Sequence, residues 1–279
     1  MLNHSVLMYD EFCSMCRWYS QRMVDIGLIA REERRSVQVC MADKGMPLID
    51  FNQAMNKIAY YNATKNQVFY GIDSILEIIS HKYPWLVNVL KWKPIIFLLN
   101  IFYNLLSYNR RIIAPTMMCN DESCTPARSW TNRILYIIVC WMMVVAIAKV
   151  FSTIPLHGSL RWPFVYIDGL TYLGQFIIQG IVLSTIGRKD VYEYFGHLAH
   201  VSLIGSLYLF CLFLGLKILT FLAMPITTPA IVSLAIVQTI MFFKHRQRVK
   251  SHNFPLILIF TWLLYRAVVV LCILNYFMT

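Results

Sequence analysis

Long apolar runs separated by short polar loops make up the second half of the chain, from Ile134 onward. A helix needs about 20 consecutive apolar residues to cross the hydrocarbon core of a bilayer. Of the 279 residues, 58% are hydrophobic and only 14% are charged, which lies outside the range of soluble globular chains. We therefore predict an integral, multi-pass membrane protein with an all-α polytopic domain of about five helices. The predicted spans are 134–151, 164–186, 198–222, 226–243 and 254–277, of which the first and the fourth are the shortest.

The preceding part of the chain alternates charged, polar and apolar residues, as a soluble domain does. The change falls near the segment CNDESCTPARSWTNR, so we expect a first domain over 1–128 and a transmembrane helical domain over 129–279. One earlier apolar stretch, 94–106, is too short to span a bilayer. We expect it to pack on the first domain or to lie at the membrane surface.

Basic residues gather before the first predicted span and in alternate loops after it, and the positive-inside rule places these segments in the cytosol. The opening residues lack the features of a signal peptide, which also favours a cytosolic N-terminal domain and an external C-terminus, in the inner or plasma membrane. Attraction to a lipid bilayer with anionic headgroups accounts for the net charge of +11, and no motif indicates nucleic-acid binding. The residues concerned are Arg110, Arg111, Arg128, Arg133, Arg188, Lys189, Lys244, Arg246, Arg248 and Lys250.

Strand and helix patterns alternate in the first domain. The segment SVLMYD reads as a strand, 13–27 as a helix ending in glycine, and SVQVCMA, which contains Cys40, as a second strand. The segments KIAYYNA and QVFYG then predict two strands joined by a turn, and 72–82 predicts a closing helix. This order is that of an α/β thioredoxin-like domain.

Two cysteines, Cys13 and Cys16, stand in C-x-x-C spacing at the start of the first predicted helix. The unpaired amide groups at a helix N-terminus favour the thiolate form of a cysteine, which is the nucleophile in disulfide exchange. We expect Cys13, the nearer to the helix end and to solvent, to attack, and Cys16 to resolve the mixed disulfide. Metal binding and inert packing remain the alternatives for this pair.

The chain resembles the DCC thiol-disulfide oxidoreductase family, also called the DUF393 domain. The resemblance rests on YDEFCSMC, with Asp10 as the motif aspartate, on VFYGIDSILEII, and on FYNLLSYNRRIIAP followed by a cysteine. Glu11 stands where the family usually has glycine. The resemblance implies a thioredoxin-like fold and a redox-active disulfide, with Asp10, Cys13 and Cys16 as the catalytic residues.

A second cysteine pair, Cys119 and Cys124, occurs in the segment CNDESC. Three interpretations remain open for it. It could exchange disulfides with the first pair, it could complete a zinc site of four thiolates, or it could consist of two unremarkable surface cysteines.

Polar residues also occur within the predicted spans. Asp168, Tyr172, Gln175 and Gln179 are spaced by four, three and four residues, so they share one face of the second span. Arg266 is expected near the bilayer midplane of the fifth span, where a charge must be paired or solvated. Two interpretations remain open: Arg266 pairs with Asp168 or the glutamines, or these residues form a polar ligand pocket.

The sequence thus predicts a membrane-anchored enzyme that exchanges electrons with a thiol or disulfide substrate, either a protein or a small molecule, on the cytosolic face. No cysteine pair lies near the outer ends of the spans, so electrons taken up by the first domain would either stay in the cytosol or pass to a lipid-soluble carrier such as a quinone. The alternatives are a zinc-stabilised or degenerate thioredoxin-fold interaction module and a thiol-regulated transporter or quinone-binding membrane protein.

Overall fold

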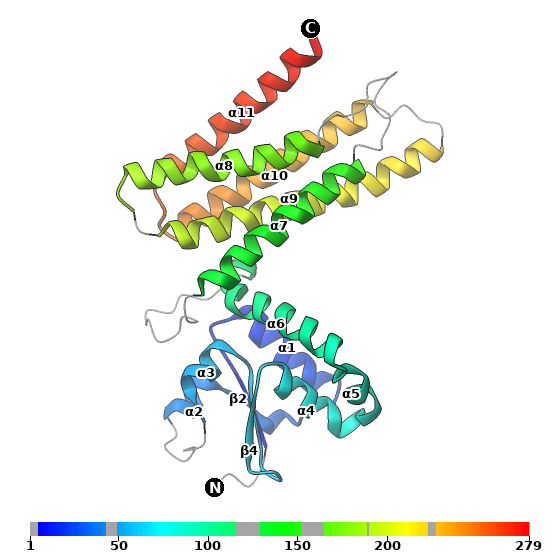
Figure 1. Cartoon of the computed structure of the whole chain (residues 1–279), viewed down its shortest axis with the longest axis vertical. Coiled ribbons are helices and arrows are strands. Elements are labelled where there is room, and N and C mark those ends of the chain that lie inside the picture. Colours follow the sequence, from blue (N-terminus) through cyan, green and yellow to red (C-terminus); the bar gives the residue numbers. More distant parts are fainter. Residues whose placement is uncertain are drawn as a thin grey trace. The chain divides into compact units, whose positions relative to one another are not determined.

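The computed structural model describes residues 5–42, 49–114, 129–151, 165–188, 190–222 and 227–278. The chain forms two compact units, Met1–Arg133 and Ile134–Thr279. The first unit combines a small sheet with helices, whereas the described part of the second is helical (Figure 1). The predicted order of an α/β part followed by a helical part is confirmed at this level.

A four-stranded mixed sheet with the order β2-β1-β3-β4 organises the first unit. The central strand β1 (Val6–Tyr9) runs parallel to β2 (Arg34–Ser36) and antiparallel to β3 (Ala59–Asn62). The parallel pair requires a crossover, which α1 (Ser14–Asp25) supplies. Strand β4 (Gln67–Tyr70) forms the predicted hairpin with β3.

Helices cover both faces of this sheet. Alternation along β1 sends Val6 and Met8 to a core cluster with residues of α2 (Val37–Ala42) and α3 (Phe51–Asn56), while Leu7 belongs to a second cluster. That second cluster includes residues of α1 and of α4 (Ile72–Lys82), on the other face. The predicted helices 13–27 and 72–82 are confirmed by α1 and α4.

The prediction of a second strand over the segment SVQVCMA is wrong for every residue after the first. Only Ser36 belongs to β2, and Val37–Ala42 is the helix α2. The Ser36 hydroxyl accepts a hydrogen bond from the backbone N–H of Val39 at 3.2 Å, which favours a helix start. Val37 and Cys40, three residues apart, are both buried in the same core cluster, so helical periodicity satisfies burial and overrides the strand preference of valine. Cys40 is a core residue that lies on a helix and not on the predicted strand.

The apolar stretch 94–106 is part of α6 (Lys93–Ile113), which follows the short helix α5 (Pro84–Leu90). Ile96, Leu99 and Tyr103 pack with residues of α4 and α5. The expectation that this stretch packs on the first domain is confirmed for one of its faces.

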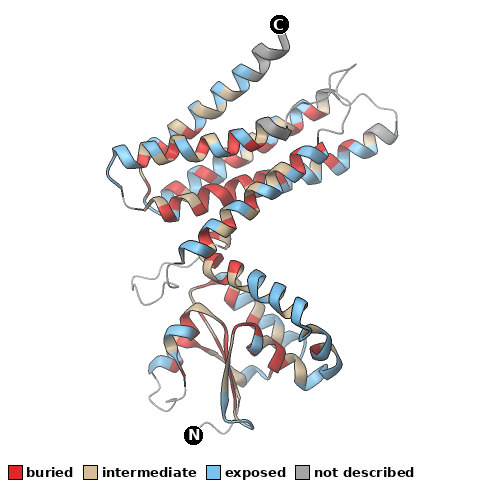
Figure 2. Cartoon of the chain, viewed as in Figure 1, coloured by how far each residue is buried: buried red, intermediate tan, exposed pale blue. Residues whose placement is uncertain are grey.

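Each of the five apolar runs of the second unit forms a helix. Figure 2 shows buried positions between these helices and exposed positions on their outer sides. One core cluster joins residues of four of the helices, including Leu183, Tyr194, Met241 and Trp262. The helices are α7 (Trp130–Phe151), α8 (Val165–Thr185), α9 (Val191–Phe221), α10 (Thr227–Ser251) and α11 (Ile257–Met278).

Two helices of the described residues, α7 and α9, are long and apolar enough to cross a membrane. Helices α5 and α6 pass the same test together only if they count as one span, although they are bent by 87°. These helices support the prediction of a membrane protein.

Candidate functional site

The candidate site lies where β1 leads into α1. Cys13 is the N-cap of α1, with an extended backbone conformation, φ −93° and ψ 112°. Its Sγ accepts a hydrogen bond from the backbone N–H of Cys16 at 3.4 Å. The sulfur atom therefore occupies the position that a serine or aspartate oxygen takes in an ordinary helix cap. This geometry matches the predicted place of the pair at the helix mouth.

Both cysteines are buried, with 0% exposure for Cys13 and 1% for Cys16. The expectation that Cys13 faces solvent is therefore wrong. The C-terminal end of α6 lies against this end of α1, because Arg110 of α6 bonds Asp10, three residues before Cys13. In this state a substrate disulfide cannot reach the Cys13 sulfur without local opening.

Asp10 and Arg110 form a buried ion pair beside the cysteines. Arg110 Nη2 lies 2.9 Å from Asp10 Oδ2 and also donates to the Met55 carbonyl at 2.7 Å. The other carboxylate oxygen of Asp10 accepts from the backbone N–H of Phe12 at 3.1 Å and from the Gln38 amide at 3.3 Å. Because both oxygens are bonded, Asp10 is held in place and in turn positions the guanidinium.

The two thiols are strongly differentiated. Hydrogen bonding from Cys16 and the positive charge of Arg110 lower the pKa of Cys13 to about 7, against the opposing effects of burial and of Asp10. The same hydrogen bond to Cys13, together with burial, raises the pKa of Cys16 far above its ordinary value. Near neutral pH Cys13 is therefore about half thiolate, whereas Cys16 stays a thiol.

Sequence reasoning missed the part played by Arg110, which it counted only among the basic residues before the first span. A signal was present in the helical periodicity of α6. Leu99, Tyr103, Ser107 and Arg110 follow one another at intervals of four, four and three residues, so they share the packed face of the helix. A charged residue on a packed face requires a buried partner, and Asp10 supplies it.

The second cysteine pair, Cys119 and Cys124, lies outside the described residues. Within the described residues no group of three or more histidine, cysteine, aspartate or glutamate side chains is placed to hold a metal ion.

The polar stripe of α8 separates into two environments. The Gln179 side chain donates to the Leu258 carbonyl of α11 at 3.3 Å and accepts from the Thr261 hydroxyl at 3.2 Å, so it joins two helices. Gln175 is buried, and its amide atoms have no hydrogen-bond partner among the described residues. The stripe therefore does not act as one polar site.

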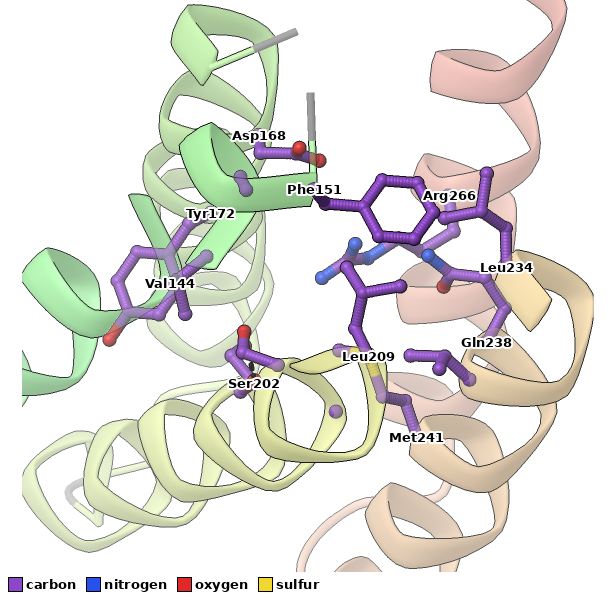
Figure 3. A pocket seen from close by; sticks show the side chains of 14 residues that line it. Val144, Phe151, Asp168, Tyr172, Ser202, Leu209, Leu234, Gln238, Met241 and Arg266 are labelled. Atoms are coloured by element: carbon purple, nitrogen blue, oxygen red, sulfur yellow. Dashed lines mark hydrogen bonds between the residues drawn. The ribbon is translucent and has the colours of Figure 1, made fainter. Parts of the chain in front are cut away.

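Asp168 and Arg266 line a partly open cavity to which all of α7, α8, α9, α10 and α11 contribute. Figure 3 shows the Arg266 guanidinium reaching into the cavity, with Asp168 and Gln238 around it. Arg266 Nε and Gln238 Oε1 are buried without a hydrogen-bond partner in the described part of the chain, and the described ion pairs do not include one between Arg266 and Asp168. Arg266 instead lies over the Trp262 ring, 5.3 Å from its centroid.

Comparison with protein-family models, curated proteins and solved structures finds no match. The resemblance to the DCC family therefore stays a prediction, and the functional argument rests mainly on the geometry of the chain itself.

Proposed function

We propose that the chain is a membrane-attached thiol-disulfide oxidoreductase whose redox pair is Cys13 and Cys16. The observation that carries this proposal is the geometry of the pair. Cys13 Sγ caps α1 and accepts from the Cys16 N–H at 3.4 Å, with the buried Asp10–Arg110 ion pair beside it, and this setting lowers the pKa of Cys13 to about 7 while Cys16 keeps its proton. The resemblance to the DCC family and the sheet order β2-β1-β3-β4, in which β3 is antiparallel to the other strands as in a thioredoxin-like fold, support it further.

The exchange proceeds in two displacements. The Cys13 thiolate attacks one sulfur of a substrate disulfide, which forms a mixed disulfide and releases the other sulfur as a thiolate that takes up a proton. Cys16 then loses its proton and attacks Cys13 Sγ, which forms the Cys13–Cys16 disulfide and releases the second substrate thiolate. Two electrons pass to the substrate, and the pair returns to its dithiol form when an external thiol reductant or a reduced lipid-soluble carrier donates two electrons.

Arg110 has a defined part in the first displacement. Its positive charge favours the thiolate form of Cys13, which is the form that attacks the substrate disulfide. Asp10 does not contact a reacting atom. It is a positioning residue that holds the guanidinium beside the pair.

Membrane attachment belongs to the same proposal. Five spans with a cytosolic N-terminal unit and an external C-terminus fit the five helices of the second unit and the distribution of basic residues. In this arrangement the redox pair lies in the cytosol. A quinol would deliver two electrons to its disulfide after a disulfide substrate is reduced, and a quinone would accept two electrons from its dithiol when the reaction runs in reverse, with a thiol substrate.

A redox titration of the full chain with thiol alkylation and mass spectrometry tests the proposal. We expect a two-electron transition at Cys13 and Cys16. Cys40, which is buried in the core cluster of Val6 and Met8, should stay reduced throughout and serves as the control. Failure of Cys13 and Cys16 to form a disulfide over the whole potential range would refute the redox function. Protection of these two together with Cys119 and Cys124 by bound zinc would favour the zinc-stabilised interaction module instead.

The cavity around Arg266 favours a second candidate function, the binding of a polar ligand within the helical unit. It offers about 70 Å³ of room for water-sized molecules, which is enough for several waters or a compact polar headgroup at about 10–15 Å³ for each water. A carbonyl or anionic group there would supply the acceptor that the described residues do not offer to Arg266 Nε. A quinone-binding or transporting membrane domain would use such a site.

A further inference from the structure

Helices α5 and α6 each expose apolar side chains on one side, and together we call these side chains the α5–α6 apolar face. On α5 and the following turn its side chains are spaced by four and three residues, and on α6 they come in pairs four residues apart, so in each helix they project to one side. Their exposed fractions lie between 38% and 67%, and Figure 2 shows the exposed side of α6. The face consists of Trp85, Val89, Trp92, Phe97, Leu98, Ile101 and Phe102.

The packing of α6 does not require this face. Ile96, Leu99 and Tyr103, on the other side of the helix, already fill the core against α4 and α5. The exposed residues are therefore additional to those that fold the unit. Contiguous exposed apolar surfaces of this kind mark sites of interaction with a protein or a membrane.

The charges around the face select the kind of partner. Lys91 and Lys93 are exposed at the end of α5 and the start of α6, whereas the Lys82 ammonium group donates to the Ile26 carbonyl at 2.9 Å. The segment 78–114 contains no acidic residue. Tryptophan at 85 and 92 adds the amphipathic ring that is enriched at the boundary between lipid and water. Basic residues flanking tryptophan, phenylalanine and leucine are typical of helices that lie in the surface of an anionic bilayer.

The same face is unsuited to symmetric pairing of two copies. In a two-fold contact each patch meets itself, so the lysines of both copies would enter one interface to which the segment 78–114 brings no acidic residue. Like charges brought together in this way oppose association.

The contacts of α6 with the α/β unit favour a position at the membrane surface over a membrane-spanning position for this helix. The Arg110 end of α6 is bonded into the α/β unit through Asp10 and the Met55 carbonyl, and the Tyr103 hydroxyl accepts from the backbone N–H of Ile58 at 2.8 Å. With these bonds in place, α6 cannot enter the hydrocarbon core lengthwise, and the 87° bend prevents α5 and α6 from acting as one straight helix.

We propose that the α5–α6 apolar face lies in the headgroup region of an anionic lipid monolayer, with Trp85, Trp92 and Phe102 inserted and the lysines near lipid phosphates. The α/β unit would thus be held against the same membrane that its helical unit enters. This inference rests on the membrane attachment proposed above and is independent of the thiol chemistry.

Photocrosslinking of the full chain in vesicles tests the inference. Single replacements of Trp92 and Phe102 by p-benzoylphenylalanine probe the face. Leu214 of α9, 51% exposed, is the positive control for lipid contact, and Trp18 of α1, 63% exposed, is the negative control. Mass spectrometry measures lipid adducts in phosphatidylcholine vesicles with and without phosphatidylglycerol.

We expect lipid adducts at Trp92 and Phe102 at a yield close to that at Leu214, with few at Trp18. Phosphatidylglycerol should increase the adducts at Trp92, and the variant Lys91→Glu/Lys93→Glu should remove that increase while leaving the yield at Leu214 unchanged.

Three results would overturn the inference. Yields at Trp92 and Phe102 as low as that at Trp18, with normal yield at Leu214, would refute the face as a lipid contact and leave membrane attachment standing. Adducts to a second copy of the chain in place of lipid would show a protein interface. Absence of lipid adducts at Leu214 as well would refute membrane attachment itself.

Discussion

The ion pair between Asp10 and Arg110 makes a prediction in which two substitutions act in opposite directions. Arg110 lowers the pKa of Cys13 and Asp10 raises it. We expect Arg110→Gln to raise that pKa above its value of about 7 and Asp10→Asn to lower it below that value. If the two substitutions only disrupted the local structure, the pKa of Cys13 would shift in the same direction in both variants.

The size of the effect follows from the titration of a single thiol. A pKa of about 7 makes Cys13 about half thiolate at pH 7, whereas the ordinary value of 9.0 would leave about 1%. A nearby opposite charge shifts a pKa by about 1–3 units, so we expect the pKa of Cys13 to rise by about 1 unit in Arg110→Gln. The thiolate fraction at pH 7 would then fall about fivefold.

The assay is the pH dependence of iodoacetamide alkylation at Cys13, followed by mass spectrometry of its peptide. Above its midpoint the thiolate predominates and the alkylation rate reaches a plateau. Lys93→Gln, which removes an exposed charge from the same helix, is the control and should leave the midpoint unchanged. In the double variant Asp10→Asn/Arg110→Gln, we expect the midpoint to lie between those of the wild type and Arg110→Gln.

Both single variants also break a buried ion pair, which costs about 3–5 kcal/mol of folding free energy. Circular dichroism must therefore show that each variant is folded at the assay temperature. A wild-type midpoint near 9.0, or shifts of the same sign in the two folded single variants, would refute the electrostatic reasoning.

Three further outcomes are expected. Cys16→Ser should accumulate mixed disulfides through Cys13, and trapping by Cys13→Ser instead, seen by non-reducing electrophoresis, would reverse the two roles. Arg266→Leu should keep or raise the thermal stability in detergent while abolishing binding of a short-chain quinone or an anionic amphiphile. A loss of thermal stability would show instead that Arg266 is a structural partner. A reporter fused after Thr279 should be accessible only from outside the cell, and a cytosolic reporter would remove one of the proposed spans.

Local patterns were sufficient to predict most of the fold. Apolar runs of helical length predicted each helix of the second unit, and the segments around the turn TKN predicted the β3–β4 hairpin. The helix α2 was not predicted, because valine favours strands. The burial of Val37 and Cys40 in one core cluster, which favours the helix, is visible only in the folded structure.

Only those features of the candidate site that depend on the local spacing of residues were predicted. The C-x-x-C spacing placed Cys13 at a helix mouth, but its burial and the partner of Asp10 depend on how α6 docks. Spacing along one helix carries no information on a residue elsewhere in the chain that packs against it. The same limit applies to Arg266, whose place on an apolar helix could be predicted from the sequence, whereas the cavity around it requires residues from five helices.

The bond between Asp10 and Arg110 has a consequence for biosynthesis, because 100 residues of chain separate its two ends. At about 5–20 residues per second, a ribosome adds Arg110 about 5–20 s after Asp10. During that interval the nascent Cys13 lacks the guanidinium that favours its thiolate, so it has more nearly the reactivity of an ordinary cysteine. The Cys13 thiolate is favoured only after α6 has packed and brought Arg110 into place. Until then the nascent chain carries a thiol at Cys13 that oxidises slowly.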